Sequence, residues 1–162
     1  MTVLILWLGS LCLSLPQMAS TDFSLNQFEP DSYQEIVDSN NVEPFLMVFW
    51  SLDCPPCIDE LLLLARFHKH YPRAKVIMVS TDSVRARDEI EQLMKQRGLH
   101  DLEHWVFTDN SIQAIRYAID PLWYGELPRS YFHSHNQPRQ ARSGRLNEQT
   151  LLLWFKATDN RT

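Results

Sequence analysis

The sequence predicts a single small domain of the mixed α/β class, in which a parallel βαβ core is followed by an antiparallel hairpin and a closing helix. Two apolar runs without polar alternation, residues 45–50 and 74–80, are typical of strands that are covered on both faces. The segments that follow these runs carry apolar residues at helical spacing. The chain has 162 residues, 44% of them hydrophobic, so it can form one domain around a core.

The first half of the chain is predicted to alternate helices and strands. Apolar residues at helical spacing behind Asp31 and Ser32 indicate a short amphipathic helix. Pro72 ends the long helix that follows the cysteines, and Gly98 is the expected C-terminal stop of a charged surface helix. The predicted order is helix, strand, helix, strand, helix, at residues 31–42, 45–50, 58–71, 74–80 and 83–97.

The second half is predicted to complete the sheet with a hairpin. Asn110 is a candidate N-cap for a helix that Pro121 closes. Asn136 and Gln137 lie between two short extended segments and indicate a hairpin turn, with Pro138 best placed on an edge strand. The predicted elements are a strand, a helix, two hairpin strands and a last helix, at residues 104–107, 110–118, 130–135, 138–143 and 147–156.

Composition excludes several classes of function. The chain has 15 Lys and Arg against 20 Asp and Glu, a net charge of -5, which disfavours nucleic acid as a partner. Only 4 glycines are present, so there is no Gly-rich loop to bind a nucleotide phosphate. We find no internal repeat and no linker to a second domain.

The N-terminal segment differs from the rest of the chain. Residues 1–21 contain no charged side chain, and the apolar run at residues 3–15 is shorter than the ~20 residues of a membrane-spanning helix but fits a signal-peptide core. We therefore expect residues 1–20 to be a signal peptide or membrane anchor and residues 21–162 to be the domain; a buried first strand or helix is the alternative. Cys12 is then a leader residue. The expected location is periplasmic or otherwise extracytoplasmic.

The other two cysteines, Cys54 and Cys57, form a CxxC motif at the turn between a buried strand and a helix. Unpaired backbone N–H groups and the dipole at a helix N-terminus stabilise an anion, so Cys54 is the expected nucleophile. Cys57 lies one turn inside the helix and is the expected resolving cysteine. The pair itself carries two electrons, so no cofactor is expected.

Residues around the two cysteines are expected to tune this chemistry. Pro55 and Pro56 suit the first helical turn but lack N–H groups that could stabilise a thiolate. Asp53 adds a negative charge beside Cys54. Both features should raise the pKa of the Cys54 thiol and make the pair more reducing. Trp50 is near enough to report the redox state by its fluorescence.

A metal site is the competing interpretation of a CxxC motif. A structural zinc site needs two further Cys or His ligands at comparable spacing, and the sequence has no second CxxC. His133 and His135 share one face of a predicted strand and could bind a metal, but solvated edge positions are the simpler interpretation. We therefore predict no metal.

The string FWSLDCPPC resembles the FWATWCPPC signature of the TlpA and ResA branch of the thioredoxin-like superfamily, and GELPRSYFHSHNQ resembles the GLPTTFLIDRDG element of that branch. The resemblance implies a thioredoxin-like α/β/α sandwich with a mixed central sheet. It also implies that Pro128 is the cis-proline that faces the cysteines, with the backbone of Leu127 available to pair with an extended client segment.

The sequence departs from the family pattern near the cysteines. Asp53 replaces an aromatic residue, and Arg129 and Ser130 replace two threonines, which brings a positive charge that could offset Asp53. Val48 stands where thioredoxin has a buried acid. The proton acceptor must then come from elsewhere, although a solvated surface carboxylate is the simpler interpretation of each candidate; the candidates are Asp53, Glu60 and Glu126.

The expected function is that of an exported thiol:disulfide oxidoreductase that reduces client disulfides. The resemblance implies apocytochrome c or copper-site assembly proteins as clients and a membrane thiol carrier as electron donor. An oxidase or isomerase, and a copper-handling or client-binding module without turnover, remain alternatives, whereas the PxxxTxxC pattern of peroxiredoxins is missing. The hairpin arginines are either a docking patch for an acidic partner or a solvated face: Arg139, Arg142 and Arg145.

Overall fold

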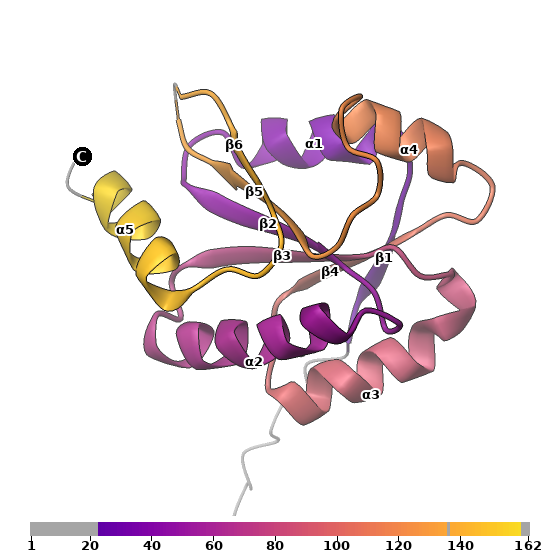
Figure 1. The fold of residues 1–162 in the computed structure, drawn as a ribbon, viewed down its shortest axis with the longest axis horizontal. Helices are drawn as coiled ribbons and strands as arrows, with labels where there is room; N and C mark the ends of the chain where they lie inside the picture. Colours follow the sequence, from indigo (N-terminus) through magenta and orange to yellow (C-terminus); the bar gives the residue numbers. More distant parts are fainter. Residues whose placement is uncertain (1–22, 136, 160–162) are drawn as a thin grey trace, which may run out of the picture.

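A computed structural model describes residues 23–135 and 137–159, so the predictions for the leader and Cys12 lie outside the described residues. Its strands form one six-stranded sheet in the order β1-β4-β3-β2-β5-β6 (Figure 1). No helix in the described part is long and apolar enough to cross a membrane. The strands are β1 (Leu25–Phe28), β2 (Phe45–Trp50), β3 (Lys75–Ser80), β4 (Glu103–Phe107), β5 (Arg129–His133) and β6 (Gln140–Ser143).

The sheet is mixed, as predicted. Strands β1, β4, β3 and β2 run parallel, whereas β5 is antiparallel to β2 and β6 is antiparallel to β5. The parallel βαβ core and the hairpin are therefore both confirmed. Because β2 and β3 are parallel, their carboxyl ends meet at one edge, where the cysteine loop begins.

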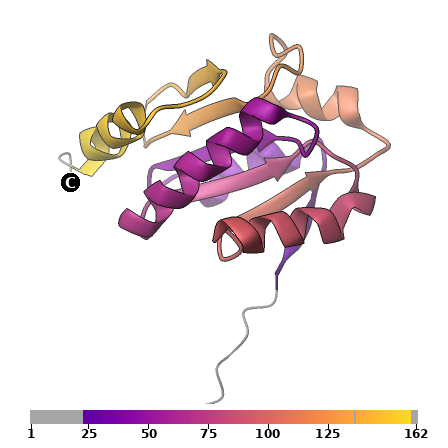
Figure 2. The same ribbon diagram turned by 60° about the horizontal axis from the view of Figure 1, so that its bottom comes forward.

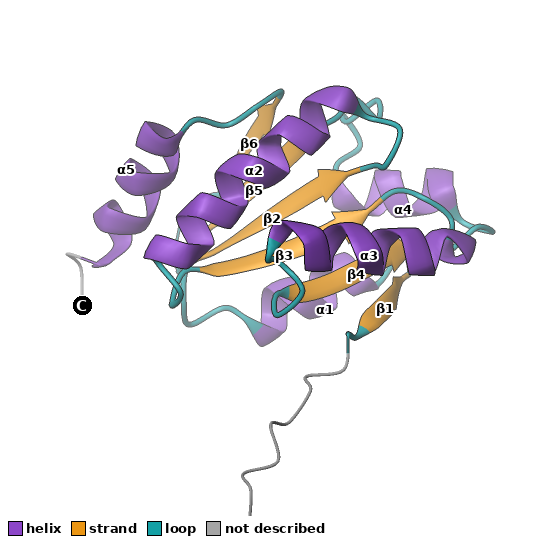
Figure 3. Cartoon of the chain, turned by 90° about the horizontal axis from the view of Figure 1, so that it is seen from below, coloured by secondary structure: helices purple, strands orange, loops and turns teal. Residues whose placement is uncertain are grey.

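Helices cover both faces of the sheet. Helices α2 and α3 lie on one face and α1 and α4 on the other (Figure 3), while α5 lies beside the hairpin (Figure 2). The α/β/α sandwich is thus confirmed. The helices are α1 (Ser32–Ser39), α2 (Pro55–His70), α3 (Arg87–Arg97), α4 (Ile112–Ile119) and α5 (Glu148–Asp159).

Strand β2 is the centre of the core. All six of its residues are buried, because alternate side chains point into the two layers. Leu46, Val48 and Trp50 pack in the α2 layer with Cys57, and the other three side chains pack in the α1 and α4 layer. This burial explains the apolar run without alternation and fixes the end of β2 that carries the cysteine loop.

The structure corrects the sequence predictions at three places. Strand β1 was not predicted, because Asn26 and Gln27 break its apolar pattern. Ser111, not Asn110, is the N-cap residue of α4, and it makes no side-chain capping bond. The predicted helix at residues 83–97 begins with a short 3-10 helix, η1 (Val84–Ala86), before α3. Gly98 ends α3 in the left-handed region, at φ 68°, as predicted.

Candidate active site

Cys54 and Cys57 are joined by a disulfide at the N-terminus of α2. Cys54 is the N-cap residue, and Cys57 follows in the first turn, with 5.2 Å between their Cα atoms. Cys57 is buried, at 1% exposure, whereas Cys54 is partly exposed. An incoming disulfide can therefore reach the sulfur of Cys54 but not that of Cys57.

The two prolines determine which amide faces the sulfur of Cys54. Pro55 and Pro56 occupy the first two helical positions and have no N–H groups. The amide of Cys57 is therefore the first donor of the helix, and it donates to Cys54 Sγ at 3.2 Å. In the reduced protein the same N–H group and the helix dipole would stabilise a Cys54 thiolate.

Asp82 holds the loop that leads to Cys54. Its Oδ1 accepts a hydrogen bond from Ser51 Oγ at 2.7 Å, and its Oδ2 accepts from the amide of Leu52 at 2.9 Å and from Ser80 Oγ at 2.6 Å. Sequence reasoning missed this residue. The available signal was that Asp82 comes two residues after the last residue of β3, whose carboxyl end lies beside that of β2.

Of the three candidate proton acceptors, Glu60 is the one that is buried. It lies three residues after Cys57 on the buried face of α2 and is 2% exposed. Its Oε2 accepts a hydrogen bond from the amide of Leu146 at 2.9 Å. Burial raises the pKa of Glu60 to about 7, against the lowering effects of the Leu146 amide, the Arg145 charge and the Ser130 hydroxyl.

The other two candidate proton acceptors are placed differently. Asp53 is exposed in the loop beside Cys54. Glu126 accepts a hydrogen bond from Ser143 at 2.7 Å and pairs with Arg129 at 3.4 Å. Desolvation acts to raise the pKa of Glu126, but the Ser143 hydroxyl and the Arg129 charge outweigh it and leave the pKa below its usual value. Glu60 is therefore the candidate whose surroundings suit proton transfer.

The peptide bond between Leu127 and Pro128 is cis, as the resemblance implied. Leu127 packs against the core cluster that contains Cys57, and the carbonyl of Pro128 accepts a hydrogen bond from the amide of Gly144 at 2.9 Å. The next residue, Arg129, pairs with Phe49 near the end of β2. The cis-proline thus lies at the same end of the sheet as the cysteine loop.

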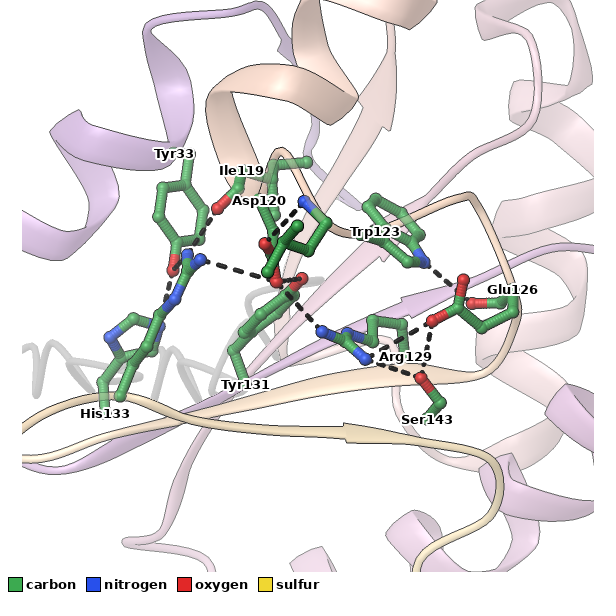
Figure 4. A network of polar contacts seen from close by, with 11 residues as sticks. Tyr33, Ile119, Asp120, Trp123, Glu126, Arg129, Tyr131, His133 and Ser143 are labelled. Atoms are coloured by element: carbon green, nitrogen blue, oxygen red, sulfur yellow. Dashed lines mark hydrogen bonds and ion pairs between the residues drawn. The ribbon is translucent and has the colours of Figure 1, made fainter.

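Arg129 does not offset the charge of Asp53, contrary to expectation. Alternation along β5 points Arg129 and Tyr131 to the face opposite α2, where the guanidinium lies 4.9 Å from the centre of the Tyr131 ring. There it contacts Asp120 at 3.0 Å and Ser143 at 2.6 Å, as well as Glu126 (Figure 4). Its charge is therefore balanced locally by carboxylates and is directed away from the sulfurs.

The two histidines of the hairpin segment, His133 and His135, lie in different surroundings. His133 is buried and stacks on Phe45 at 4.5 Å between ring centroids, so it is not the solvated edge residue that was expected. Burial lowers the pKa of His133 to about 4, with a further contribution from Arg139. His135 lies after the strand and contacts the carbonyl of Asn41. Among the described residues no group of three metal-ligating side chains occurs.

The hairpin arginines are separated by the fold. Arg139 turns inward, where it contacts Tyr33 and Asp120. Arg145 pairs with Asp59 on α2, and Arg142 is exposed on β6. These three side chains do not form one docking patch. Trp50 is buried in the cluster that contains Cys57, and its indole N–H finds no hydrogen-bond acceptor among residues 23–135 and 137–159.

Comparison with solved structures identifies the fold. A thioredoxin-related protein from Neisseria meningitidis serogroup B is 21% identical, with a TM-score of 0.58 over 77% of this chain and 91% of that chain. A secreted disulfide oxidoreductase of Mycobacterium tuberculosis, described as homologous to E. coli DsbE, is 16% identical, with a TM-score of 0.58 over 74% of this chain and 85% of that chain. The chain has the thioredoxin-like fold.

A third thioredoxin-like neighbour is StoA from Bacillus subtilis, which is 19% identical, with a TM-score of 0.53 over 71% of this chain and 84% of that chain. No protein-family model matches the sequence, and no curated protein sequence matches it. The thioredoxin-like assignment therefore rests on the three-dimensional likeness. It agrees with the position of the CxxC motif at the end of β2 and with the cis-proline before β5.

Proposed function

We propose that this thioredoxin-like protein is a thiol:disulfide oxidoreductase that reduces disulfide bonds of client proteins outside the cytoplasm. The observation that carries the proposal is the Cys54–Cys57 disulfide at the N-terminus of α2, with an accessible outer sulfur and a buried inner one. This asymmetry assigns the attack on the client to Cys54 and the resolution to Cys57.

The reaction consists of two thiol exchanges. The Cys54 thiolate attacks one sulfur of the client disulfide, forms a mixed disulfide and releases one client thiolate, which takes up a proton. Cys57 then loses its proton and attacks the sulfur of Cys54, which releases the second client cysteine. The client gains two electrons and two protons, and the protein is left with the Cys54–Cys57 disulfide described above.

Glu60 is suited to receive the proton of Cys57. Both residues lie on the buried face of α2, and the pKa of Glu60 near 7 lets its carboxylate take and return a proton close to neutral pH. In thioredoxin the buried acid lies on the strand, at the position of Val48 here. We infer that in this chain the helix supplies the carboxylate in its place.

The client binds across the cysteine loop and the cis-proline segment. The backbone of Leu127 pairs with an extended client segment, as the family resemblance implies, which brings the client disulfide to Cys54. The electron donor is a thiol carrier in the membrane, and the clients are proteins such as apocytochrome c or copper-site assembly proteins. The apolar leader and the secreted Mycobacterium tuberculosis neighbour support an extracytoplasmic location.

The direction of reaction is tested by the reduction potential of the pair. The chain is equilibrated in dithiothreitol or glutathione buffers, alkylated and analysed by mass for free thiols. The prolines and Asp53 limit thiolate stabilisation, so we expect a value near or below the ~-270 mV of thioredoxin. A value near ~-120 mV would instead identify a disulfide donor. If the pair does not cycle, the oxidoreductase proposal is wrong and a client-binding or copper-handling module is the better account.

A further inference from the structure

Arg129 contacts both ends of the loop that precedes the cis-proline. One guanidinium nitrogen lies 3.0 Å from Asp120 Oδ2, at the end of α4. The other nitrogen lies 3.4 Å from Glu126 Oε1 and 2.6 Å from Ser143 Oγ on β6 (Figure 4). The side chain is only 13% exposed. The Arg129 guanidinium, which is only partly exposed, therefore connects the start of the loop, its end and the edge strand.

The loop is also anchored between these two ends. Trp123 is buried, packs on Phe49 and donates from its indole N–H to the carbonyl of Glu126 at 2.9 Å. Gly125 has a φ of 94°, and a Cβ there would lie 2.8 Å from the guanidinium carbon of Arg116. The backbone is thus fixed by contacts up to Glu126, directly before the Leu127–Pro128 peptide.

The Asp120 carboxylate that binds Arg129 is itself held by other donors. Asp120 accepts hydrogen bonds from Tyr131 at 3.1 Å and from the amide of Leu122 at 3.0 Å, and Arg139 lies 3.5 Å away. Desolvation acts to raise the pKa of Asp120, but these hydrogen bonds and the arginine charges lower it below its usual value. The carboxylate therefore stays ionised, so the bridge to Arg129 persists at neutral pH.

We propose that Arg129 is a positioning residue for polypeptide clients: it holds the segment that ends in Leu127 and Pro128 in the geometry that receives an extended client chain. This inference rests on the function proposed above. Arg129 itself points away from the sulfurs and contacts neither cysteine, so it acts on client alignment and not on the exchange chemistry.

An arginine is required by this geometry. Three acceptors, on Asp120, Glu126 and Ser143, surround the two terminal nitrogens of one planar group. A lysine has a single ammonium group at the end of a flexible chain and cannot reach both ends of the loop in the same fixed arrangement. A lysine variant should therefore keep the charge but lose much of the alignment.

The test compares a polypeptide substrate with a small one. The probes are a synthetic extended peptide that contains one disulfide between a fluorophore and a quencher, and hydroxyethyl disulfide, which is too small to span the loop. For Arg129→Met we expect KM for the peptide to rise about tenfold, with kcat for the peptide and the rate with hydroxyethyl disulfide unchanged. Arg129→Lys should give an intermediate KM. The reduction potential of the pair should be unchanged in both variants.

Arg73→Met is the matched control, because Arg73 is exposed and follows the far end of α2 from the cysteines. Its kinetics should equal those of the wild type. If Arg129→Met slows both substrates equally, or slows neither, the positioning role is wrong. If Arg129→Met does not fold, the same comparison of the two substrates is made with Arg129→Lys, and equal effects on both substrates, or none, would again contradict the positioning role. A wild-type protein that reduces neither probe would overturn the proposed function itself and, with it, any role in client alignment.

Discussion

The buried carboxylate of Glu60 accepts a hydrogen bond from the amide of Leu146, 2.9 Å away and 86 positions later in the chain. This contact joins α2 to the segment between β6 and α5. Glu60 is 2% exposed, so water hardly solvates its ionised form. The burial that suits Glu60 to proton transfer therefore lowers the stability of the fold when the carboxylate is charged.

The free energy of unfolding of the wild type should fall relative to that of Glu60→Gln as the pH rises from about 4.5 to about 7. The pKa of Glu60 is about 7 in the folded state against 4.5 in the reference state, so folding binds a proton between these values and stability is lost as pH rises toward 7. The loss should reach about 3 kcal/mol. Glu60→Gln keeps the acceptor for Leu146 without the charge, so its curve of unfolding free energy against pH should separate from the wild-type curve across this range, with the variant the more stable toward pH 7.

The measurement is urea unfolding of the oxidised protein at a series of pH values, with Glu89→Gln as control. Glu89 is exposed on α3, so its variant should follow the wild-type curve. Parallel curves for wild type and Glu60→Gln would show that Glu60 is not the group that titrates.

Removal of the Asp82 side chain should loosen the cysteine loop. Asp82→Ala loses three hydrogen bonds to a carboxylate, to Ser51, Leu52 and Ser80, and should lower the free energy of unfolding by about 2–4 kcal/mol. The rate with hydroxyethyl disulfide should fall as well, because the position of Cys54 is no longer fixed. Asp82→Asn retains part of the network and should lose less on both measurements.

The control for Asp82 is Asp88→Ala, on the exposed face of α3. Its stability should lie within about 0.5 kcal/mol of the wild type. Full activity of Asp82→Ala would mean that the loop is held by its other contacts, such as the bond from the amide of Thr81 to the carbonyl of Trp50.

The two cysteines should have separable roles. Cys57→Ser leaves the accessible sulfur of Cys54 without a resolving partner, so a stable mixed disulfide with the peptide substrate should accumulate. Cys54→Ser should form little or none, because Cys57 is buried. Mass spectrometry of acid-quenched mixtures measures the adduct, and the double variant is the blank. Equal trapping by both single variants would contradict the assignment of roles.

Local patterns in the sequence were enough to predict β2, the helix that follows it and the position of the cysteine motif. A strand buried on both faces is a continuous apolar run, and the CxxC motif comes directly after that run. The burial of Glu60 was not predictable in this way, since it depends on Leu146, far along the chain. The direction of Arg129 was available from strand alternation: if Ser130 faces the α2 layer, its neighbour must face the other layer.

Asp53 should raise the pKa of the Cys54 thiol in the reduced protein through its negative charge. Asp53→Asn removes that charge from an exposed loop, so the pKa of Cys54 should fall, and only modestly because water and salt screen the pair. The potential of the pair should become less negative with it, since a stabilised thiolate favours the reduced form. Thiolate absorbance as a function of pH measures the change.

The control is Glu43→Gln, in the exposed turn before β2 and at the opposite end of the strand from the cysteines. This variant should leave the titration of Cys54 unchanged. A Cys54 pKa that stays unchanged or rises in Asp53→Asn would contradict this effect of the Asp53 charge.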